Sequence, residues 1–129
     1  MIPIIFINCK RYPFIRWIMN RTKLFETRNR NTLGRFLGER VLLAETGHGQ
    51  PLVLCSAVIT EVREVFTRSA WEVTKLDCMI SDGSPYDWKP DTKKKVLYRL
   101  SDVRPVKPFH PEGRRHGRIW MEYEGSVTA

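Results

Sequence analysis

The apolar residues of this chain fall into short runs interrupted by glycine and proline, which limits the secondary structure that can form. Some runs are β-branched, as in Ile2–Asn8, and others alternate with polar residues, as in Lys95–Val103. Both patterns are typical of strands, because successive side chains of a strand point to opposite faces of a sheet. The sequence therefore predicts about six strands, over residues 2–8, 23–28, 39–45, 52–65, 95–103 and 118–123.

Two short helices are predicted between these strands. Phe14, Trp17 and Ile18 recur at helical spacing and predict a helix over Tyr12–Asn20. A second short helix, capped by Thr67 or Ser69, is expected to carry Trp71 and Leu76. A sheet of short, mostly antiparallel strands on a small chain tends to close into a barrel, which removes its exposed edges. The expected fold class is α+β, mainly β: a small β-barrel with short helices.

The 129 residues correspond to one domain, 1–129, whose last few residues are expected to fray. Residues 29–38 and 81–92 are predicted to be loops. Pro105, Pro108 and Pro111 predict an extended connection before the last strand.

The charge distribution is uneven and favours a polyanionic partner. Lysine and arginine number 22 against 14 acidic residues, a net charge of +8, and residues 1–40 alone hold nine basic and two acidic groups. Such a cationic surface binds phosphates by releasing their counterions, so RNA or a nucleotide is the expected partner. The alternative is that the charge only keeps the chain soluble.

Other function classes find little support in the sequence. Three scattered cysteines do not make a disulfide framework or a zinc site, and the three histidines lack metal-ligand spacing. There is no glycine-rich phosphate loop and no apolar run long enough to cross a membrane. We therefore expect no metal, no cofactor and a cytoplasmic location, and the sequence makes no prediction about protein partners.

Three stretches occur in an order that resembles a known family. They are residues 13–19 with 23–28, residues 38–43 leading to 57–62, and residues 98–106 leading to 117–120. Together they resemble the ASCH domain, a branch of the PUA-like superfamily. Its signature is Gly-x-Lys-x-x-Glu-x-Arg, which Lys23, Glu26 and Arg28 match, whereas Arg21 stands where glycine is usual.

This resemblance implies a small β-barrel with helices against its openings and a cleft beside the signature. It also implies RNA binding, RNA processing or recognition of modified bases, and some ASCH proteins resemble ribonucleases. One branch hydrolyses N4-acetylcytidine with a lysine, a threonine and a glutamate, the threonine taking the position of the signature glutamate. Because Glu26 occupies that position here, this activity does not carry over intact.

The signature residues can supply a cationic cleft. Glu26 and Arg28 share a face of a strand, and Lys23 joins them only from a preceding turn or across a bulge. Lys23 and Arg28 can hold a phosphate, while Glu26 can accept a base N–H, orient Arg28 or act as a general base. Lys23 and Glu26 would be catalytic only if the protein is an enzyme, and the alternative is a salt bridge at a strand edge.

Further candidates lie near the end of the chain. Tyr98 can either stack on a base or pack in the core with its hydroxyl satisfied. Arg114, Arg115 and Arg118 form the densest basic cluster, which can contact phosphates or remain a solvated loop.

Lys93–Lys95 follow Tyr86 and Trp88, and aromatic residues beside cations suit single-stranded nucleic acid, although a flexible solvated loop is the simpler interpretation. The sequence thus predicts an RNA- or nucleotide-binding domain. The alternatives are a metal-independent ribonuclease or modified-nucleoside amidohydrolase, and a non-catalytic protein-interaction module.

Overall fold

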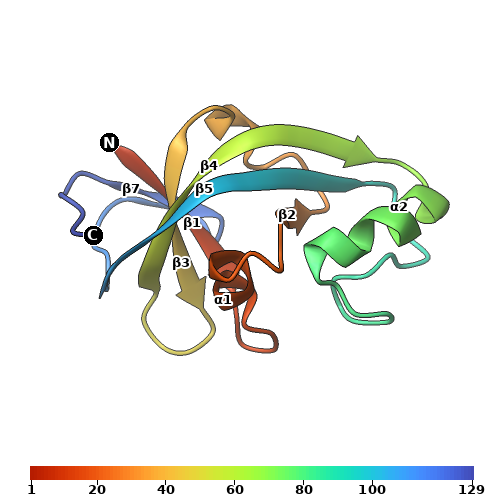
Figure 1. Ribbon diagram of the computed structural model, residues 1–129, viewed down its shortest axis with the longest axis horizontal. Helices are drawn as coiled ribbons and strands as arrows, with labels where there is room; N and C mark the ends of the chain where they lie inside the picture. Colours follow the sequence, from red (N-terminus) through yellow and green to blue (C-terminus); the bar gives the residue numbers. More distant parts are fainter.

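The computed structural model describes all 129 residues and contains one sheet of seven strands in the order β2-β5-β4-β3-β1-β7-β6 (Figure 1). The strands are β1 (Ile2–Asn8), β2 (Phe25–Arg28), β3 (Arg40–Thr46), β4 (Leu52–Val65), β5 (Lys95–Phe109), β6 (Arg115–His116) and β7 (Trp120–Tyr123). The helices are α1 (Phe14–Met19) and α2 (Arg68–Thr74), with the 3₁₀ turns η1 (Gly34–Phe36) and η2 (Lys75–Cys78). The predicted mainly β class is confirmed. None of the helices is long and apolar enough to span a bilayer.

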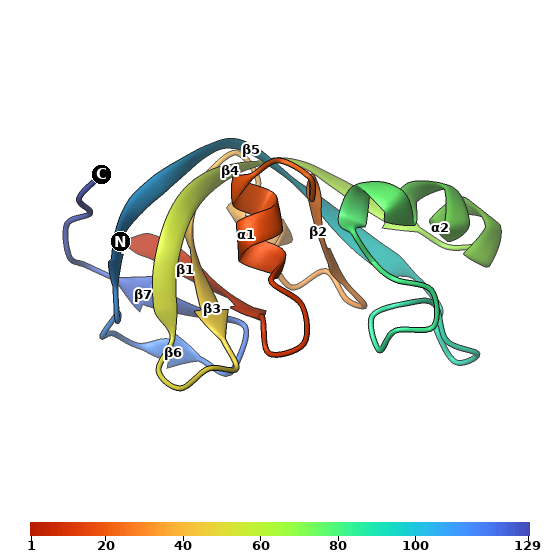
Figure 2. The same ribbon diagram turned by 60° about the horizontal axis from the view of Figure 1, so that its bottom comes forward.

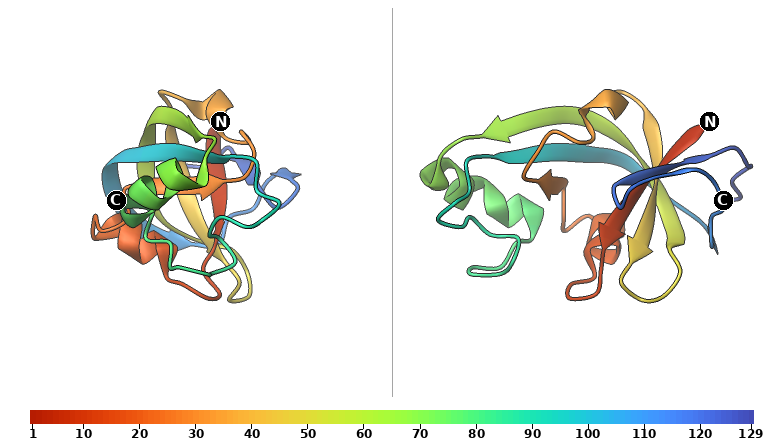
Figure 3. Two further views of the ribbon diagram at one scale, coloured as in Figure 1. Left: turned by 90° about the vertical axis from the view of Figure 1, so that its right-hand side faces the viewer. Right: turned by 180° about the vertical axis from the view of Figure 1, so that it is seen from behind.

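The sheet is strongly curved, but it does not close into the expected barrel. The long strands β4 and β5 arch over α1, and the end-on view shows the sheet curling around its interior (Figures 2 and 3). All neighbouring strands are antiparallel except β1 and β3, which are parallel. The edge strand β2 pairs with β5 alone, so no strand pairing joins it to β1. The fold therefore keeps a gap between these two strands.

Two hydrophobic clusters pack against the opposite faces of the sheet. The larger cluster has 24 buried residues and includes Ile5 and Ile7 of β1 together with Phe14 and Ile15 of α1. The smaller cluster of seven includes Ile4 and other side chains on the opposite face of β1. The alternation of neighbouring β1 residues between the two clusters explains why this strand is a continuous apolar run. Helix α1 thus packs on the face of β1 that carries Ile5 and Ile7, next to the gap between β1 and β2.

Helix α1 ends in a turn that fixes the start of the ASCH-like signature. The Thr22 N–H donates to the Trp17 carbonyl at 3.0 Å, and the Arg21 N–H donates to the Ile18 carbonyl at 3.1 Å. This pair of bonds defines a Schellman motif, in which the residue after the C-cap adopts a left-handed backbone and is usually glycine. Arg21 adopts that backbone, with φ of 67°. The glycine of the signature is replaced, and yet the turn forms.

Strand β5 runs six residues beyond its predicted end at Val103, through Pro105 and Pro108 to Phe109. Beyond Arg99 it has no further partner in β2, so its outer edge needs no ladder hydrogen bonds and tolerates proline. The predicted strand 118–123 is likewise corrected, because residues 117–119 form the turn between β6 and β7. The segment after Tyr123 lies outside the sheet, and one backbone bond of 2.7 Å, from the Lys107 N–H to the Thr128 carbonyl, joins it to β5.

Candidate functional site

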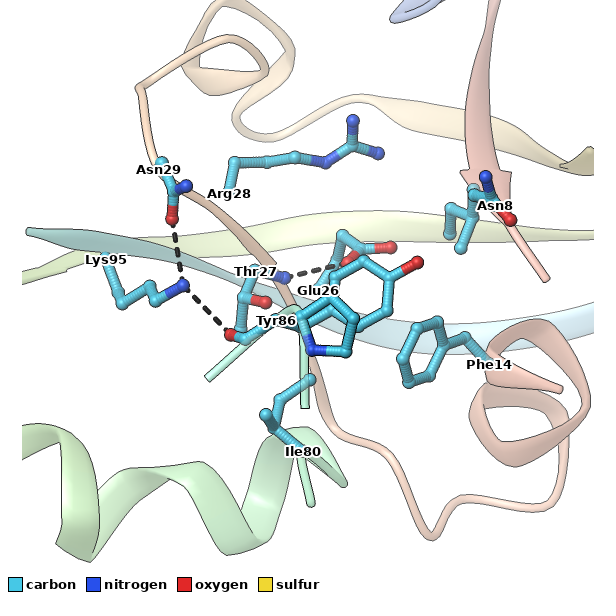
Figure 4. Close-up of a pocket in the computed structure, with 11 residues that line it drawn as sticks. Asn8, Phe14, Glu26, Thr27, Arg28, Asn29, Ile80, Tyr86 and Lys95 are labelled. Carbon is cyan, nitrogen blue, oxygen red and sulfur yellow. Dashed lines mark hydrogen bonds between the residues drawn. The ribbon is translucent and has the colours of Figure 1, made fainter. Parts of the chain in front are cut away.

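A pocket of about 230 Å³ occupies the gap between β1 and β2 (Figure 4). The C-terminal end of β1 forms one side and β2 with Asn29 forms the other, while α1 and the segment after η2 supply apolar side chains. The pocket exists because the backbones of β2 and β1 do not pair, which leaves space where a closed barrel would have a strand pair. Its lining residues are Ile7, Asn8, Phe14, Glu26, Thr27, Arg28, Asn29, Ile80, Pro85, Tyr86 and Lys95.

Glu26 supplies the most unusual group in this pocket. Its side chain lines the pocket although the residue is only 7% exposed. Oε1 accepts a hydrogen bond from the Thr27 N–H at 2.9 Å, whereas Oε2 is buried and has no hydrogen-bond partner. A buried polar atom without a partner costs about 1–3 kcal/mol, and more when it is charged. The pocket therefore contains an acceptor that a ligand donor can satisfy.

Lys23 lies behind the pocket, and it is not one of the residues that line it. It occupies the turn before β2, as convergence with Glu26 requires, but it is 1% exposed and its Nζ donates to the Cys78 carbonyl at 2.5 Å. The ammonium also lies 4.5 Å from the centre of the Phe14 ring. Burial lowers the pKa of Lys23, and the nearby Glu26 carboxylate opposes this shift. The structure therefore places Lys23 in the interior, bonded to a carbonyl, and not at the surface of the pocket.

Arg28 bridges the gap in the sheet. Its Nη2 donates to the Phe6 carbonyl at 2.8 Å, from β2 to β1. That carbonyl is available because the register of β7 with β1 ends at Ile5, opposite Trp120. A guanidinium has five N–H donors, so the side chain keeps donors for a ligand. Glu26 and Arg28 thus line one pocket, as the strand alternation predicts.

Lys95 is the second pocket cation, and it was not among the predicted site residues. It is only 4% exposed, and its Nζ donates to Asn29 Oδ1 and to the Tyr86 carbonyl, each at 2.9 Å. Burial lowers its pKa, which is the expected effect on a cation taken out of water. The sequence indicates this cation through the grouping of Lys93–Lys95 with Tyr86, but a flexible solvated loop was the simpler interpretation of that grouping.

The 81–92 segment is held in place by Asp87, which the sequence analysis did not single out. Its carboxylate accepts hydrogen bonds from the Trp71 indole N–H at 2.7 Å and from the Gly83 and Trp88 backbone N–H groups, each at 2.8 Å. Lys75 adds an ion pair at 3.5 Å. Burial acts to raise the pKa of Asp87, but these hydrogen bonds outweigh it and hold the pKa well below its usual range. Asp87 thus fixes the wall that carries Tyr86.

Tyr98 belongs to the core and does not reach the pocket. It is fully buried, and its hydroxyl donates to Asn31 Oδ1 at 3.0 Å and accepts from the Leu33 N–H at 3.2 Å. The structure therefore places Tyr98 in the core with its hydroxyl satisfied, and its ring does not line the pocket.

The basic cluster of the β6–β7 hairpin is separate from the pocket. Arg114, Arg115 and Arg118 are all exposed. Arg114 lies 3.8 Å from the Glu122 carboxylate, and the Arg115 guanidinium lies 5.5 Å from the centre of the Phe6 ring, whose side chain belongs to the smaller cluster. None of the three lines the pocket, so the structure does not bring them together with Glu26 and Arg28.

The curved, mainly β sheet has α1 at its opening and a pocket beside the signature residues. No model of a known protein family matches the chain, and no curated protein matches it. Solved structures do match, and they are ASCH proteins.

The ASCH protein from Zymomonas mobilis superposes with a TM-score of 0.69 at 20% identity, covering 84% of this chain and 72% of that one. A serine-to-alanine variant of the same protein gives the same values. A tyrosine-to-phenylalanine variant gives a TM-score of 0.68 at 20% identity, covering 84% of this chain and 74% of that one. The chain therefore has the ASCH fold that the three sequence stretches predict.

Proposed function

We propose that this protein binds RNA or a nucleotide and that the pocket between β1 and β2 receives one base. The observation that carries the proposal is the buried Glu26 Oε2, which lines the pocket and lacks a donor. Nucleobases carry N–H groups on the edges that proteins recognise when a base is unstacked. A base N–H donated to this oxygen would satisfy it, and a charge-assisted bond of this kind is among the stronger hydrogen bonds.

The other lining groups suit the remaining parts of a nucleotide. The rings of Phe14 and Tyr86 lie 5.3 Å apart in an edge-to-face arrangement and give the pocket an apolar wall. Arg28 and Lys95 add two cations to the lining of the pocket, where they can meet base carbonyl groups or a phosphate. The volume of about 230 Å³ is below that of pockets for drug-sized ligands and suits a single base. The net charge of +8 and the ASCH fold are in agreement with a nucleic-acid partner.

The proposal is tested by titrating the four nucleoside monophosphates and a mixed-sequence tetranucleotide into the protein by calorimetry. Glu26→Gln keeps the shape of the side chain but replaces the charged acceptor. We expect it to weaken binding of the preferred base by about 10- to 150-fold, the value of a hydrogen bond to a charged group. Glu64→Gln is the matched control, since Glu64 pairs with Lys94 on the outer part of the sheet and lies outside the pocket. Unchanged binding by Glu26→Gln, or no binding by the native chain, contradicts the proposal.

A second candidate function is hydrolysis of RNA or of a modified nucleoside in the same pocket. The observation that favours it is the free Glu26 carboxylate oxygen, together with the buried Lys23, whose pKa is lowered by burial and raised by the Glu26 carboxylate. Glu26 would then take the proton from the attacking water or hydroxyl group. Glu26→Gln should in that case reduce the rate by about 10²–10⁴-fold while the substrate still binds. Incubation with mixed RNA and with N4-acetylcytidine, followed by product chromatography, separates this candidate from binding alone.

A further inference from the structure

Outside the pocket, aromatic rings and cations meet a second time, on the β6–β7 hairpin. The His116 and Trp120 rings are stacked face to face, with centroids 4.0 Å apart and an angle of 6° between their planes. His116 Nε2 donates to Glu122 Oε2 at 2.7 Å, which fixes the orientation of the ring. The two residues are register partners across β6 and β7, so the sheet holds the stack in place.

The outer face of this stack belongs to His116. Trp120 is only 8% exposed and packs in the larger cluster, edge-to-face with Phe36 at 4.8 Å, whereas the His116 side chain is 32% exposed. The Arg35 guanidinium lies 5.8 Å from the centre of the Trp120 ring. The exposed Arg114, Arg115 and Arg118 occupy the same hairpin as the stack. Of these, Arg114 lies 3.8 Å from Glu122, the residue that holds His116, whereas the Arg115 guanidinium lies over Phe6. A flat, fixed ring with arginines at its two partners, Glu122 and Trp120, matches the two parts of a nucleotide, a base with a planar face and a phosphate.

The stack lies on the same face of the sheet as the pocket. Ile5 and Ile7 are two residues apart on β1, and both belong to the cluster that contains Trp120. Ile7 lines the pocket and Ile5 is the register partner of Trp120, so His116 is two strands across and two residues back from the pocket wall. With strands about 4.8 Å apart and a rise of about 3.3 Å per residue, this separation is roughly 12 Å. Figure 2 shows the β6–β7 hairpin beside β1.

We propose that the exposed face of His116 is a stacking platform for a second base of a single-stranded RNA whose first base occupies the pocket. This inference rests on the proposed function. Roughly 12 Å corresponds to three or four stacked nucleotides at about 3.4 Å each, so a tetranucleotide can reach both places. Arg114, next to Glu122, and Arg35, next to Trp120, contact phosphates of this RNA without reading sequence, whereas Arg115 faces the other side of the sheet. The platform accepts any of the bases, because every base has a face that can stack.

The experiment compares a nucleoside monophosphate with a tetranucleotide that carries the same base. The monophosphate reports on the pocket alone, and the tetranucleotide reports on the pocket and the platform. We expect His116→Ala to weaken tetranucleotide binding by about 5- to 150-fold, the usual value of base stacking on a side chain, and to leave monophosphate binding unchanged. His116→Phe retains the flat ring and should restore most of the tetranucleotide affinity.

His110→Ala is the matched control, because His110 is exposed and its ring bonds the Pro51 carbonyl and is not part of the stack. Near-ultraviolet circular dichroism checks that the variants retain the native packing. Equal tetranucleotide affinity for the native chain and His116→Ala overturns the platform, and so does the failure of His116→Phe to restore it. If the native chain does not bind the monophosphate, the pocket proposal is contradicted instead, so the two failures are distinguishable.

Discussion

Arg21 occupies a backbone position that favours glycine, and replacing it tests how the start of the signature is built. Arg21 follows the C-cap of α1 with φ of 67°, inside the Schellman motif formed with Trp17 and Ile18. A left-handed backbone costs a residue with a β carbon about 1–2 kcal/mol. Glycine removes this strain, but its greater freedom in the unfolded chain offsets about 0.4–1 kcal/mol of the gain. We therefore expect Arg21→Gly to raise the free energy of unfolding by about 0.5–1 kcal/mol.

The assay is urea denaturation followed by tryptophan fluorescence, together with a thermal melt. For a chain of this size the gain corresponds to a Tm increase of about 2–4 °C. Arg21 is exposed, so loss of its side chain should change little else.

Two variants control for the loss of one arginine. Arg21→Ala keeps a β carbon in the left-handed region and should leave stability within about 0.5 kcal/mol of the native value. Arg16→Gly places glycine inside α1 at an exposed position and should lower stability by about 0.8 kcal/mol. If Arg21→Gly is no more stable than Arg21→Ala, strain at this turn is not the reason why the family signature carries glycine.

Three further measurements follow from the structure. Asp87→Ala should lower the free energy of unfolding by about 3 kcal/mol, because it leaves the buried Trp71 N–H without an acceptor. The control Asp82→Ala removes an exposed carboxylate and should lower it by less than about 1 kcal/mol. Equal effects of the two variants in urea denaturation would refute the assigned role of Asp87. Burial raises the pKa of Cys55 from its ordinary value near 9 to about 12, so above pH 9 the unfolded chain binds fewer protons than the folded chain and stability should fall as pH rises. The free energy of unfolding is measured by denaturation under reducing conditions between pH 9.5 and 10.5. Its decrease with pH should be smaller by about 1 kcal/mol per pH unit in Cys55→Ala than in the native chain, and an equal decrease in both would contradict this prediction. Tetranucleotide affinity should decrease with salt with a log–log slope of roughly −0.7 per phosphate contacted, and affinity that is flat between low and moderate salt would exclude phosphate contacts.

The gap between β1 and β2 connects the fold to the proposed function. A closed barrel would pair the backbone groups of these strands, whereas here the Arg28 side chain makes the connection to Phe6. The opening leaves a pocket whose lining includes an unsatisfied carboxylate and two cations, and this is where the proposed base would bind. The same opening places the pocket on the face of the sheet that continues to His116.

The strand pattern of this protein follows from its sequence. Alternating and β-branched runs predicted β4 over Leu52–Val65 without error, and they placed β1 and β3 to within one residue. These patterns are local, since the period of a strand requires only that one of its faces be buried. The order of three motifs likewise predicted the ASCH fold. The sequence also predicted that Glu26 and Arg28 share one face of a strand, which requires only the alternation of β2.

The tertiary structure decided which of these side chains reach the pocket. Lys23 precedes β2 and Lys95 is the first residue of β5. The turn after α1 directs Lys23 to the Cys78 carbonyl, whereas the segment held by Asp87 brings the Tyr86 carbonyl to Lys95. Such differences depend on contacts between residues distant in sequence, here separated by 55 positions in the case of Lys23 and Cys78. Local propensity carries no information about these contacts, because a buried cation is positioned by whichever acceptor the fold supplies.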